Sequence, residues 1–398
     1  MTSFYFVNVS SYLNNVMNKI PLIAIFVGIL LWSCKENSDP DPLPTPVPAI
    51  SSFEPAGAIG GSEVTITGSN FSDVLSVTIG ATEATIKSVS AEKIVFIVPD
   101  GASTDKINVS TKDNSAASQD DFFVGGYWRL TNAPANLETY STAHFQIGDD
   151  FYYGLGYHTC MGCSLTDRTA LVKFDPAEEK WINQNPYPSL AATGTFYFTI
   201  NDKAYVGGGH GSKSLSIDPK VYQFDHASGS WSEYSTTPEM AFKWTGLSFN
   251  GKGYIFISGG KIFEFDPQAK TWKENNPFPG IPVQSSFVIA DKEYVLMEGG
   301  QWWEFAPATS TWTEKKRFAA ETSEILFAFM LENRIYVGND QDFSSYNPAM
   351  DTWTQLQSYP GQLSDNVTGF SSGGKGYAGL PEILADPVVN EVYAFEIH

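Results

Sequence analysis

Two closely spaced cysteines, Cys160 and Cys163, have the clearest potential for chemistry in this sequence. Thiols separated by two residues can form a local disulfide, ligate zinc, attach haem or act as a redox pair. Zinc requires four ligands, and only His158 lies nearby in the sequence. Covalent haem attachment requires a His directly after the second Cys, but this position is Ser164. We therefore predict a Cys160–Cys163 disulfide that holds a loop together and no metal site, with a redox-active pair as the alternative.

Several segments predicted to be loops combine aromatic side chains with carboxylates, amides and cations. This mixture suits a sugar or a peptide ligand, and solvated loop residues without a ligand are the alternative interpretation. His144 lies instead in a predicted strand, and we interpret it as structural. The candidate ligand-binding residues are Tyr140, Tyr157, His158, Arg168, His210, Lys213, Trp244, Glu321 and Glu324.

The rest of the sequence contains no recognisable catalytic motif. It has no Gly-x-Ser-x-Gly nucleophile elbow, no His cluster with metal-ligand spacing and no phosphate-binding loop. Acid–base residues on loops leave little signature in a sequence, so catalysis stays an alternative to the binding function that we favour. We predict no catalytic residues and no cofactor. The formal net charge of -20 repels phosphate backbones, which excludes nucleic acid as a main partner.

A short phrase that recurs five times indicates which elements position these residues. An aromatic residue, followed by Asp in three copies and by Pro one position later in four, precedes a Trp at a constant distance. A period of about 40 to 50 residues indicates a repeated supersecondary unit, and regular recurrence indicates packing and turn roles for the phrase itself. The copies are Phe174-Asp175-Pro176 with Trp181, Phe224-Asp225 with Trp231, Phe265-Asp266-Pro267 with Trp272, Phe305-Ala306-Pro307 with Trp312, and Tyr346-Asn347-Pro348 with Trp353.

Each repeat is expected to contain four short strands, with the aromatic phrase in the third strand and the Trp in the fourth. Asn201-Asp202 and Asn250-Gly251 provide tight turns, and a glycine pair such as Gly299-Gly300 ends the second strand. Aromatic residues make up 14% of the chain and charged residues 17%, which suits short strands joined by turns. The pattern resembles the kelch family, and this resemblance implies an all-β fold whose repeats are the blades of a β-propeller.

The two ends of the repeat region predict a ring of six blades. The chain ends with Val392-Tyr393-Ala394-Phe395-Glu396, a third strand that no fourth strand follows. The missing strand is present before the first full repeat, where residues 126–131 include Tyr127-Trp128-Arg129-Leu130. This strand would complete the sixth blade and leave no open edge. We therefore assign residues 125–398 to the propeller.

The repeats differ most in the segment between their second and third strands. It is short in repeats three and four and long in repeats one, two and six, which are neighbours in a closed ring. In a propeller these segments share one face with the connections between blades. Long loops on one face of a repeat fold usually form the binding surface, so we predict a ligand site across blades 6, 1 and 2.

Residues 49–124 differ from the repeats and read as a separate module. Short β-branched runs, such as Val64-Thr65-Ile66-Thr67 and Lys93-Ile94-Val95-Phe96-Ile97-Val98, alternate with Gly, Asn and Pro clusters. This spacing predicts a small antiparallel β-sandwich. The phrases resemble the IPT/TIG family of immunoglobulin-like domains, which implies a spacer or a binding platform.

The N-terminal segment has the pattern of a lipoprotein signal peptide. Lys19 precedes an apolar run from Ile20 to Trp32, which is short for a membrane span. The ending Leu31-Trp32-Ser33-Cys34 resembles a bacterial lipobox, which implies removal of residues 1–33 and lipidation of Cys34. An ordinary secretory signal is the alternative, and Met17 is an alternative start.

A proline-rich stretch follows the predicted lipidation site. Residues 34–48 would form an extended tether that holds the folded part away from a membrane. Lys35-Glu36 resembles the export signal of Bacteroidetes-type lipoproteins. This resemblance implies an outer-membrane protein and favours the cell surface over the periplasmic face.

These observations favour a lipid-anchored envelope protein that binds a glycan or another envelope protein through the loops of blades 6, 1 and 2. A sugar epimerase or mutarotase is the second hypothesis, because some six-bladed kelch-like propellers are sialic acid epimerases. An anionic substrate would require Arg, and the chain has only Arg129, Arg168, Arg317 and Arg334. A structural spacer is the third hypothesis. A His or carboxylate with a shifted pKa in the central pocket would favour the enzyme.

Overall fold

The computed structural model describes most of the chain after residue 45. The predicted signal peptide, the lipidated Cys34 and nearly all of the tether lie outside the described residues and stay predictions. Within the described part, no helix combines the length and the apolar character that crossing a membrane requires. The described ranges are 46–99, 102–134, 142–158, 166–190, 192–211, 217–240, 244–257, 260–280, 283–318, 325–339, 342–361, 367–380 and 391–397.

The first module is a β-sandwich built by alternating buried and exposed residues. In β3, Val64 and Ile66 are buried while their neighbours are partly or fully exposed, as expected for a strand with one face on a core. Ile94, Phe96 and Val109 from other strands complete this core. The strand order is β1 (Ala49–Glu54), β3 (Glu63–Ser69), β6 (Lys93–Ile97), β5 (Thr82–Val89), β4 (Val74–Ile79), β7 (Asp105–Thr111), β8 (Ser115–Val124) and β2 (Gly57–Ala58).

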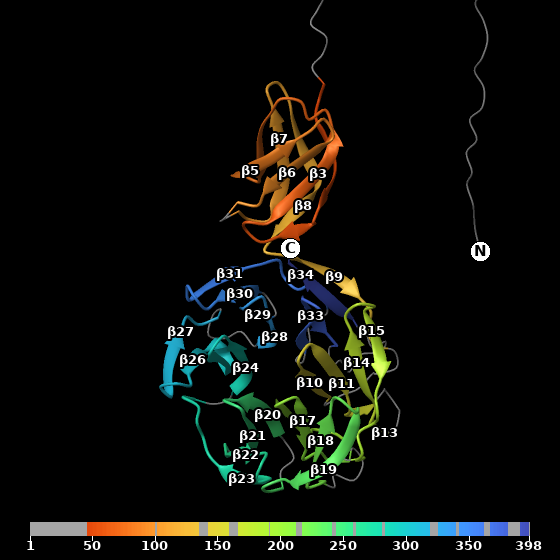
Figure 1. Cartoon of the computed structure of the whole chain (residues 1–398), viewed down its shortest axis with the longest axis vertical. Coiled ribbons are helices and arrows are strands. Elements are labelled where there is room, and N and C mark those ends of the chain that lie inside the picture. Colours follow the sequence, from red (N-terminus) through yellow and green to blue (C-terminus); the bar gives the residue numbers. More distant parts are fainter. Residues whose placement is uncertain are drawn as a thin grey trace, which may run out of the picture. The chain divides into compact units, whose positions relative to one another are not determined.

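The second region consists, in the described residues, of six four-stranded antiparallel sheets arranged as a six-bladed propeller (Figure 1). Blades 1 and 2 are β10 (Ala143–Ile147), β11 (Asp150–Gly154), β14 (Leu171–Asp175), β15 (Lys180–Asn183), and β16 (Phe196–Ile200), β17 (Lys203–Gly207), β18 (Lys220–Asp225), β19 (Ser230–Thr236). Blades 3 and 4 are β20 (Trp244–Phe249), β21 (Lys252–Ile257), β22 (Ile262–Asp266), β23 (Thr271–Glu274), and β24 (Val283–Ile289), β25 (Lys292–Met297), β26 (Trp302–Ala306), β27 (Thr311–Lys315), with the 3-10 turn η1 (Glu298–Gly300). Blades 5 and 6 are β28 (Ile325–Leu331), β29 (Arg334–Asn339), β30 (Phe343–Asn347), β31 (Thr352–Gln355), and β32 (Thr368–Ser372), β33 (Lys375–Gly379), β34 (Val392–Glu396), β9 (Tyr127–Thr131).

The repeated aromatic phrase has the packing role expected from its regularity. In each of the six blades the aromatic residue of the third strand pairs with the Trp of the fourth, with ring centroids between 4.6 and 5.1 Å apart. Each indole N–H donates to a carbonyl at or shortly after the end of the preceding blade's outer strand, as Trp181 does to Asn132 at 2.8 Å. The Asp of the phrase accepts backbone N–H groups of the following turn, as Asp175 does from Ala177. These contacts join neighbouring blades and fix the turns.

The ring closes between blade 6 and blade 1, as the sequence predicts. β9 pairs with β34, so Trp128 lies opposite Phe395. Across the next junction, the Gln146 side chain donates to the Ser371 carbonyl at 2.7 Å, and Phe151 stacks on Phe370 at 3.8 Å. The outer strand of blade 6 therefore comes from residues that precede the first blade in the chain.

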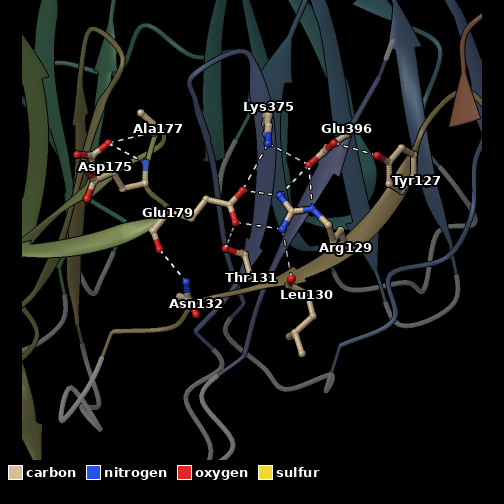
Figure 2. Close-up of polar contacts among 11 residues, drawn as sticks. Tyr127, Arg129, Leu130, Thr131, Asn132, Asp175, Ala177, Glu179, Lys375 and Glu396 are labelled. Carbon is tan, nitrogen blue, oxygen red and sulfur yellow. Dashed lines mark hydrogen bonds and ion pairs between the residues drawn. The ribbon is translucent and has the colours of Figure 1, made fainter. Parts of the chain in front are cut away.

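A cluster of charged side chains reinforces this closure (Figure 2). We define the Arg129 cluster as Tyr127, Arg129, Glu179, Lys375 and Glu396. Arg129 Nη1 donates to Glu179 at 3.0 Å and Arg129 Nη2 donates to Glu396 at 2.8 Å. Tyr127 and Lys375 also donate to Glu396, at 2.9 and 3.0 Å. Glu179 belongs to the outer turn of blade 1, so the cluster joins that blade to blade 6.

The cluster shifts the pKa of both carboxylates in the same direction. The hydrogen bond from Arg129 is the largest cause that lowers the pKa of Glu179 to about 2. Burial alone would raise the pKa of Glu396, but hydrogen bonds from Arg129, Lys375 and Tyr127 outweigh it and lower the pKa to about 2. Both groups are therefore carboxylates at any physiological pH, and both are paired.

Candidate functional site

A cavity of about 740 Å³ lies at the axis of the propeller and is lined by residues of all six inner strands. The labels of β10, β20, β24 and β28 mark inner strands near the centre of the ring in Figure 1. In every blade an apolar inner-strand residue pairs with a Tyr of the second strand, as Phe145 pairs with Tyr152. Since side chains alternate along a strand, the residue before each apolar one belongs to the axial face.

The axial positions at this level form a ring with two large and four small residues. His144 and Tyr197 occupy it in blades 1 and 2, and the other four blades have residues with little or no side chain. At this level the wall is therefore aromatic in blades 1 and 2, whereas the other four blades contribute backbone and small side chains. The ring consists of His144, Tyr197, Gly246, Ser286, Ala328 and Gly369.

Gly246 is required by a close approach between two inner strands. A Cβ at this position would lie 2.2 Å from the Tyr197 carbonyl oxygen, a distance that backbone atoms cannot relieve without a shift of the strand. The Ser248 hydroxyl, two residues further on, donates to the Thr199 carbonyl at 2.6 Å. β16 and β20 are thus held together directly, which fixes the position of Tyr197 at the cavity wall.

His144 is a neutral residue of the cavity wall. Burial lowers its pKa to about 4, so the imidazole carries no charge at neutral pH. The Tyr197 hydroxyl lies 3.1 Å from each of its ring nitrogens, and the two ring centroids are 4.8 Å apart. The pair therefore presents aromatic surface and neutral hydrogen-bonding groups.

Two oxygens beside the cavity are buried and have no hydrogen-bond partner among the described residues. They are Oγ1 of Thr195, a residue only 5% exposed, and Oε1 of Gln284. Both residues line the cavity. A β-bulge between Val283 and Ser285 interrupts the pairing of β24 with β25 at Gln284. Bulges re-aim side chains and are common beside binding sites, and an unpaired buried oxygen costs about 1–3 kcal/mol.

The charge of the cavity differs from the charge of the whole chain. Among the described lining residues, none is Asp, Glu, Lys or Arg. The sequence as a whole carries a formal net charge of -20. The described wall thus offers hydroxyl, amide, imidazole and aromatic groups, without a cation for an anionic ligand and without a carboxylate for acid–base chemistry.

The predicted loop residues are only partly brought to this cavity. His210 lines it, and its backbone forms bridges with Thr193 and Ile217. Tyr157 pairs with Asp167 in a small hairpin of β12 (Tyr157–His158) and β13 (Thr166–Asp167), and Arg168 N donates to the Gly156 carbonyl at 2.9 Å. Neither Tyr157 nor Arg168 is among the described lining residues.

The other predicted site residues lie beyond what the structure describes. Trp244 begins β20 and His158 ends β12, but their side chains are outside the described part. The predictions for all of these positions, including the disulfide, stay predictions. The positions wholly outside are Tyr140, Cys160, Cys163, Lys213, Glu321 and Glu324.

The loop arrangement itself agrees with the sequence. The second and third strands are separated by residues 155–170 in blade 1, 208–219 in blade 2 and 380–391 in blade 6. The same connection covers only 258–261, 298–301 and 340–342 in blades 3, 4 and 5. Ion and hydrogen-bond contacts place blade 6 beside blade 1, so the three long connections belong to consecutive blades.

Sequence reasoning missed the axial residues. It interpreted His144 as structural and gave no role to Thr195, Tyr197 or Gln284. Their signal was a polar residue at every second position of an inner strand, as in Thr195, Tyr197 and Thr199. In a strand with a fully buried outer face, this alternation points to a polar channel.

Comparison with known proteins identifies the first module. Residues 48–124 match the IPT/TIG domain family, and they form an IPT/TIG domain. No curated protein matches the chain with significant similarity.

Several solved structures resemble the chain at low identity. The structure of YjhT is 14% identical, covers 62% of this chain and 91% of its own, and has a TM-score of 0.48. Two structures titled auxiliary nutrient binding protein come from Bacteroides thetaiotaomicron VPI-5482 and Bacteroides ovatus ATCC 8483. The first is 11% identical and covers 89% of this chain and 98% of its own; the second is 15% identical and covers 88% and 97%. Both have a TM-score of 0.43, and similarity at this level does not assign a ligand or an activity to this chain.

Proposed function

We propose that this chain is a non-catalytic, glycan-binding protein of the cell envelope, and that the glycan binds at the face of the propeller that carries the long loops. The observation that carries the proposal is the central cavity of about 740 Å³ with its neutral polar and aromatic wall. Small-molecule sites usually enclose about 300–1,000 Å³ and combine apolar surface with a few placed polar groups. A featureless axis would have favoured a structural spacer.

The long loops and the cavity belong to one candidate site because His210 is part of both. It lies within the long connection 208–219 of blade 2 and lines the cavity. Thr195 and Gln284 lie near the starts of their inner strands, at the end of each strand that receives the connection from the preceding blade. A glycan chain would extend from the cavity over the loops, where Tyr157, Arg168 and Trp244 are candidate contacts.

The test is binding of the full chain, purified in detergent, to a glycan array, followed by titration calorimetry with the glycans that bind. Trp244→Ala and Arg168→Ala are expected to weaken binding about threefold to tenfold, because each removes one loop contact. Met350→Ala, at an exposed position on an outer turn of blade 5, is the control. Absence of any glycan signal would refute the proposal and leave an envelope protein as the alternative partner.

A sugar epimerase or mutarotase is the second candidate, and one observation favours it. His144 is a buried, pKa-shifted residue in the central cavity, as such an enzyme would require. However, a pKa of about 4 makes it a weak base at neutral pH, and the described lining residues include no carboxylate. Proton NMR of sugars mixed with the protein decides between binding and catalysis. A mutarotase would accelerate the exchange of anomers, an epimerase would form a second sugar, and either activity should be lost in His144→Gln.

The envelope location is part of the same proposal and rests on the sequence around Cys34. Incorporation of labelled palmitate into the chain, and its loss in Cys34→Ala, is the expected result. Protease treatment of intact cells would then distinguish the cell surface from the periplasmic face.

A further inference from the structure

The buried oxygens of Thr195 and Gln284 are the most unusual feature of the cavity. Within the described structure, neither oxygen has a donor or acceptor in reach, although each residue lines a space large enough for a ligand. A native chain usually pairs such groups, because leaving one unpaired costs about 1–3 kcal/mol. Rotation of either side chain toward a hydrogen-bonding occupant of the cavity would remove this cost.

The two oxygens come from different sides of the wall. Thr195 precedes β16 of blade 2 and Gln284 belongs to β24 of blade 4. A hydroxyl can donate and accept, whereas an amide oxygen accepts only. An occupant that satisfies both must therefore have a donor for Gln284 and a hydrogen-bonding group for Thr195, and several hydroxyl groups around one ring meet this requirement.

The wall next to Thr195 is aromatic. Tyr197 follows two residues later on the same face of the strand and lines the cavity, with its hydroxyl turned to His144. With the hydroxyl engaged in this way, the ring is available to the cavity chiefly as an apolar face. Across the ring, Ala328 of blade 5 and Gly369 of blade 6 leave space rather than large side chains.

The charge distribution restricts the occupant further. The described lining residues include no Lys or Arg that could pair with a carboxylate, and the formal net charge of -20 repels anions from the whole chain. Against the described wall, a carboxylate would lose its hydration without gaining a cation, which is unfavourable.

From these four observations we propose that the central cavity binds an uncharged sugar unit, stacked on Tyr197 and hydrogen-bonded by Thr195 and Gln284, and that it rejects carboxylated sugars. The inference rests on the proposed function, since it names the part of the glycan that enters the cavity. It goes further by assigning contact residues and a charge selectivity to this site.

The first experiment compares an acidic sugar with its uncharged methyl ester. The probes are trigalacturonic acid and its methyl ester, with maltotriose and cellotriose as further neutral sugars, titrated into the full chain by calorimetry. Binding of at least one neutral sugar is expected, with the acid at least about tenfold weaker than its ester. Equal affinity of the acid and the ester would overturn the inference and leave the proposed function standing.

The second experiment removes the oxygens with little change of shape. Thr195→Val and Gln284→Met are each expected to lower the affinity for the tightest-binding neutral probe about fivefold to tenfold, as loss of one hydrogen bond implies. The matched controls Thr313→Val and Gln268→Met, both at exposed positions away from the cavity, should change the affinity less than about twofold.

The outcomes separate the two proposals. Neutral-sugar binding that survives Thr195→Val and Gln284→Met unchanged overturns the cavity site but retains glycan binding at the loops. Failure of every neutral and acidic glycan to bind overturns both. Circular dichroism and the unfolding midpoint of each variant confirm that a loss of affinity does not come from a loss of fold.

Discussion

The Arg129 cluster and the central cavity are both polar regions of the same propeller, but they differ in how their polar groups are satisfied. In the cluster, two carboxylates share donors from Arg129, Lys375 and Tyr127 at distances near 3 Å. In the cavity wall, the oxygens of Thr195 and Gln284 have no partner in the described structure. The cluster lies where blade 6 closes the ring on blade 1, and the cavity lies at the axis, where we propose that a ligand binds.

Other buried groups without a partner in the described structure, such as the Tyr377 hydroxyl, do not line the cavity, so it is the adjoining cavity that distinguishes Thr195 and Gln284 from the paired groups of the cluster. Fully paired polar groups stabilise a fold. Removing one partner is costly because it leaves the other buried and unpaired. Unpaired buried groups lower the stability of the free protein, and this stability is recovered when a ligand pairs with them. Binding sites commonly reduce the stability of a fold in this way. Removal of a polar group should therefore lower stability in the cluster and weaken binding in the cavity.

Acid should remove the contribution of the cluster more completely than any single substitution. Glu179 and Glu396 have a pKa of about 2, below the usual value of about 4.5, so the folded state binds protons less readily than the unfolded state. Their contribution is fully present above about pH 4.5 and is lost as the pH falls toward 2. Urea unfolding across this range should show the loss, and Glu396→Gln should have a flatter profile than the wild type. An unchanged slope would mean that the cluster is not formed.

Arg129→Met should lower the free energy of unfolding by about 3 kcal/mol, because it leaves two largely buried carboxylates with Lys375 as the main remaining cation. The estimate is at the lower end for buried pairs, since the Arg129 side chain is 40% exposed. Lys180→Met, which breaks the exposed pair with Glu178, should change nothing measurable in the same urea titration. Similar effects of the two variants would contradict the closure role.

Gly246→Ala should destabilise the propeller by about 2 kcal/mol through overpacking against the Tyr197 carbonyl. It should also weaken sugar binding, because it displaces the strand that carries Tyr197. Gly280→Ala is the matched control, since its Cβ would meet the flexible Met297 side chain at 3.3 Å. A thermal unfolding midpoint for Gly246→Ala equal to that of Gly280→Ala would show that the two inner strands are less tightly packed.

Tyr127→Phe should cost about 1 kcal/mol, the usual contribution of one hydrogen bond, here the bond to Glu396 at 2.9 Å. Sugar affinity should not change, because Tyr127 belongs to the outer strand of blade 6. Denaturant unfolding and calorimetry on the same preparation check both parts. Loss of affinity in this variant would link the two regions in a way that the structure does not predict.

The sequence predicts the closure of the ring better than it predicts the cavity. Trp128 stands alone before the first blade, and its match to the other repeat Trp residues indicates that β9 completes blade 6. The constant distance between two aromatic residues is a local pattern, so it can be recognised from the sequence alone. The alternation within the inner strands is local too, but by itself it indicates only a strand with two different faces.

The residues that line the cavity cannot be identified from a local sequence pattern, and the reasons are physical. Thr195 and Tyr197 are ordinary strand residues, and only the pairing of Phe198 with Tyr205 shows which neighbours belong to the axial face. Gln284 depends on a bulge, and a bulge is visible only when two strands are paired. Loop length directed attention to the face of the proposed site, whereas the polar wall of the cavity depends on how six separate strands meet.

The most direct test of the account is the thermal unfolding of Thr195→Val with and without the tightest neutral trisaccharide. Without sugar, the account predicts a midpoint equal to or above that of the wild type, because the substitution removes an unpaired buried oxygen. With saturating sugar, the wild-type midpoint should rise more than that of the variant, in proportion to their affinities. A variant that is less stable than the wild type without sugar, and that gains the same increase with sugar, would contradict the account.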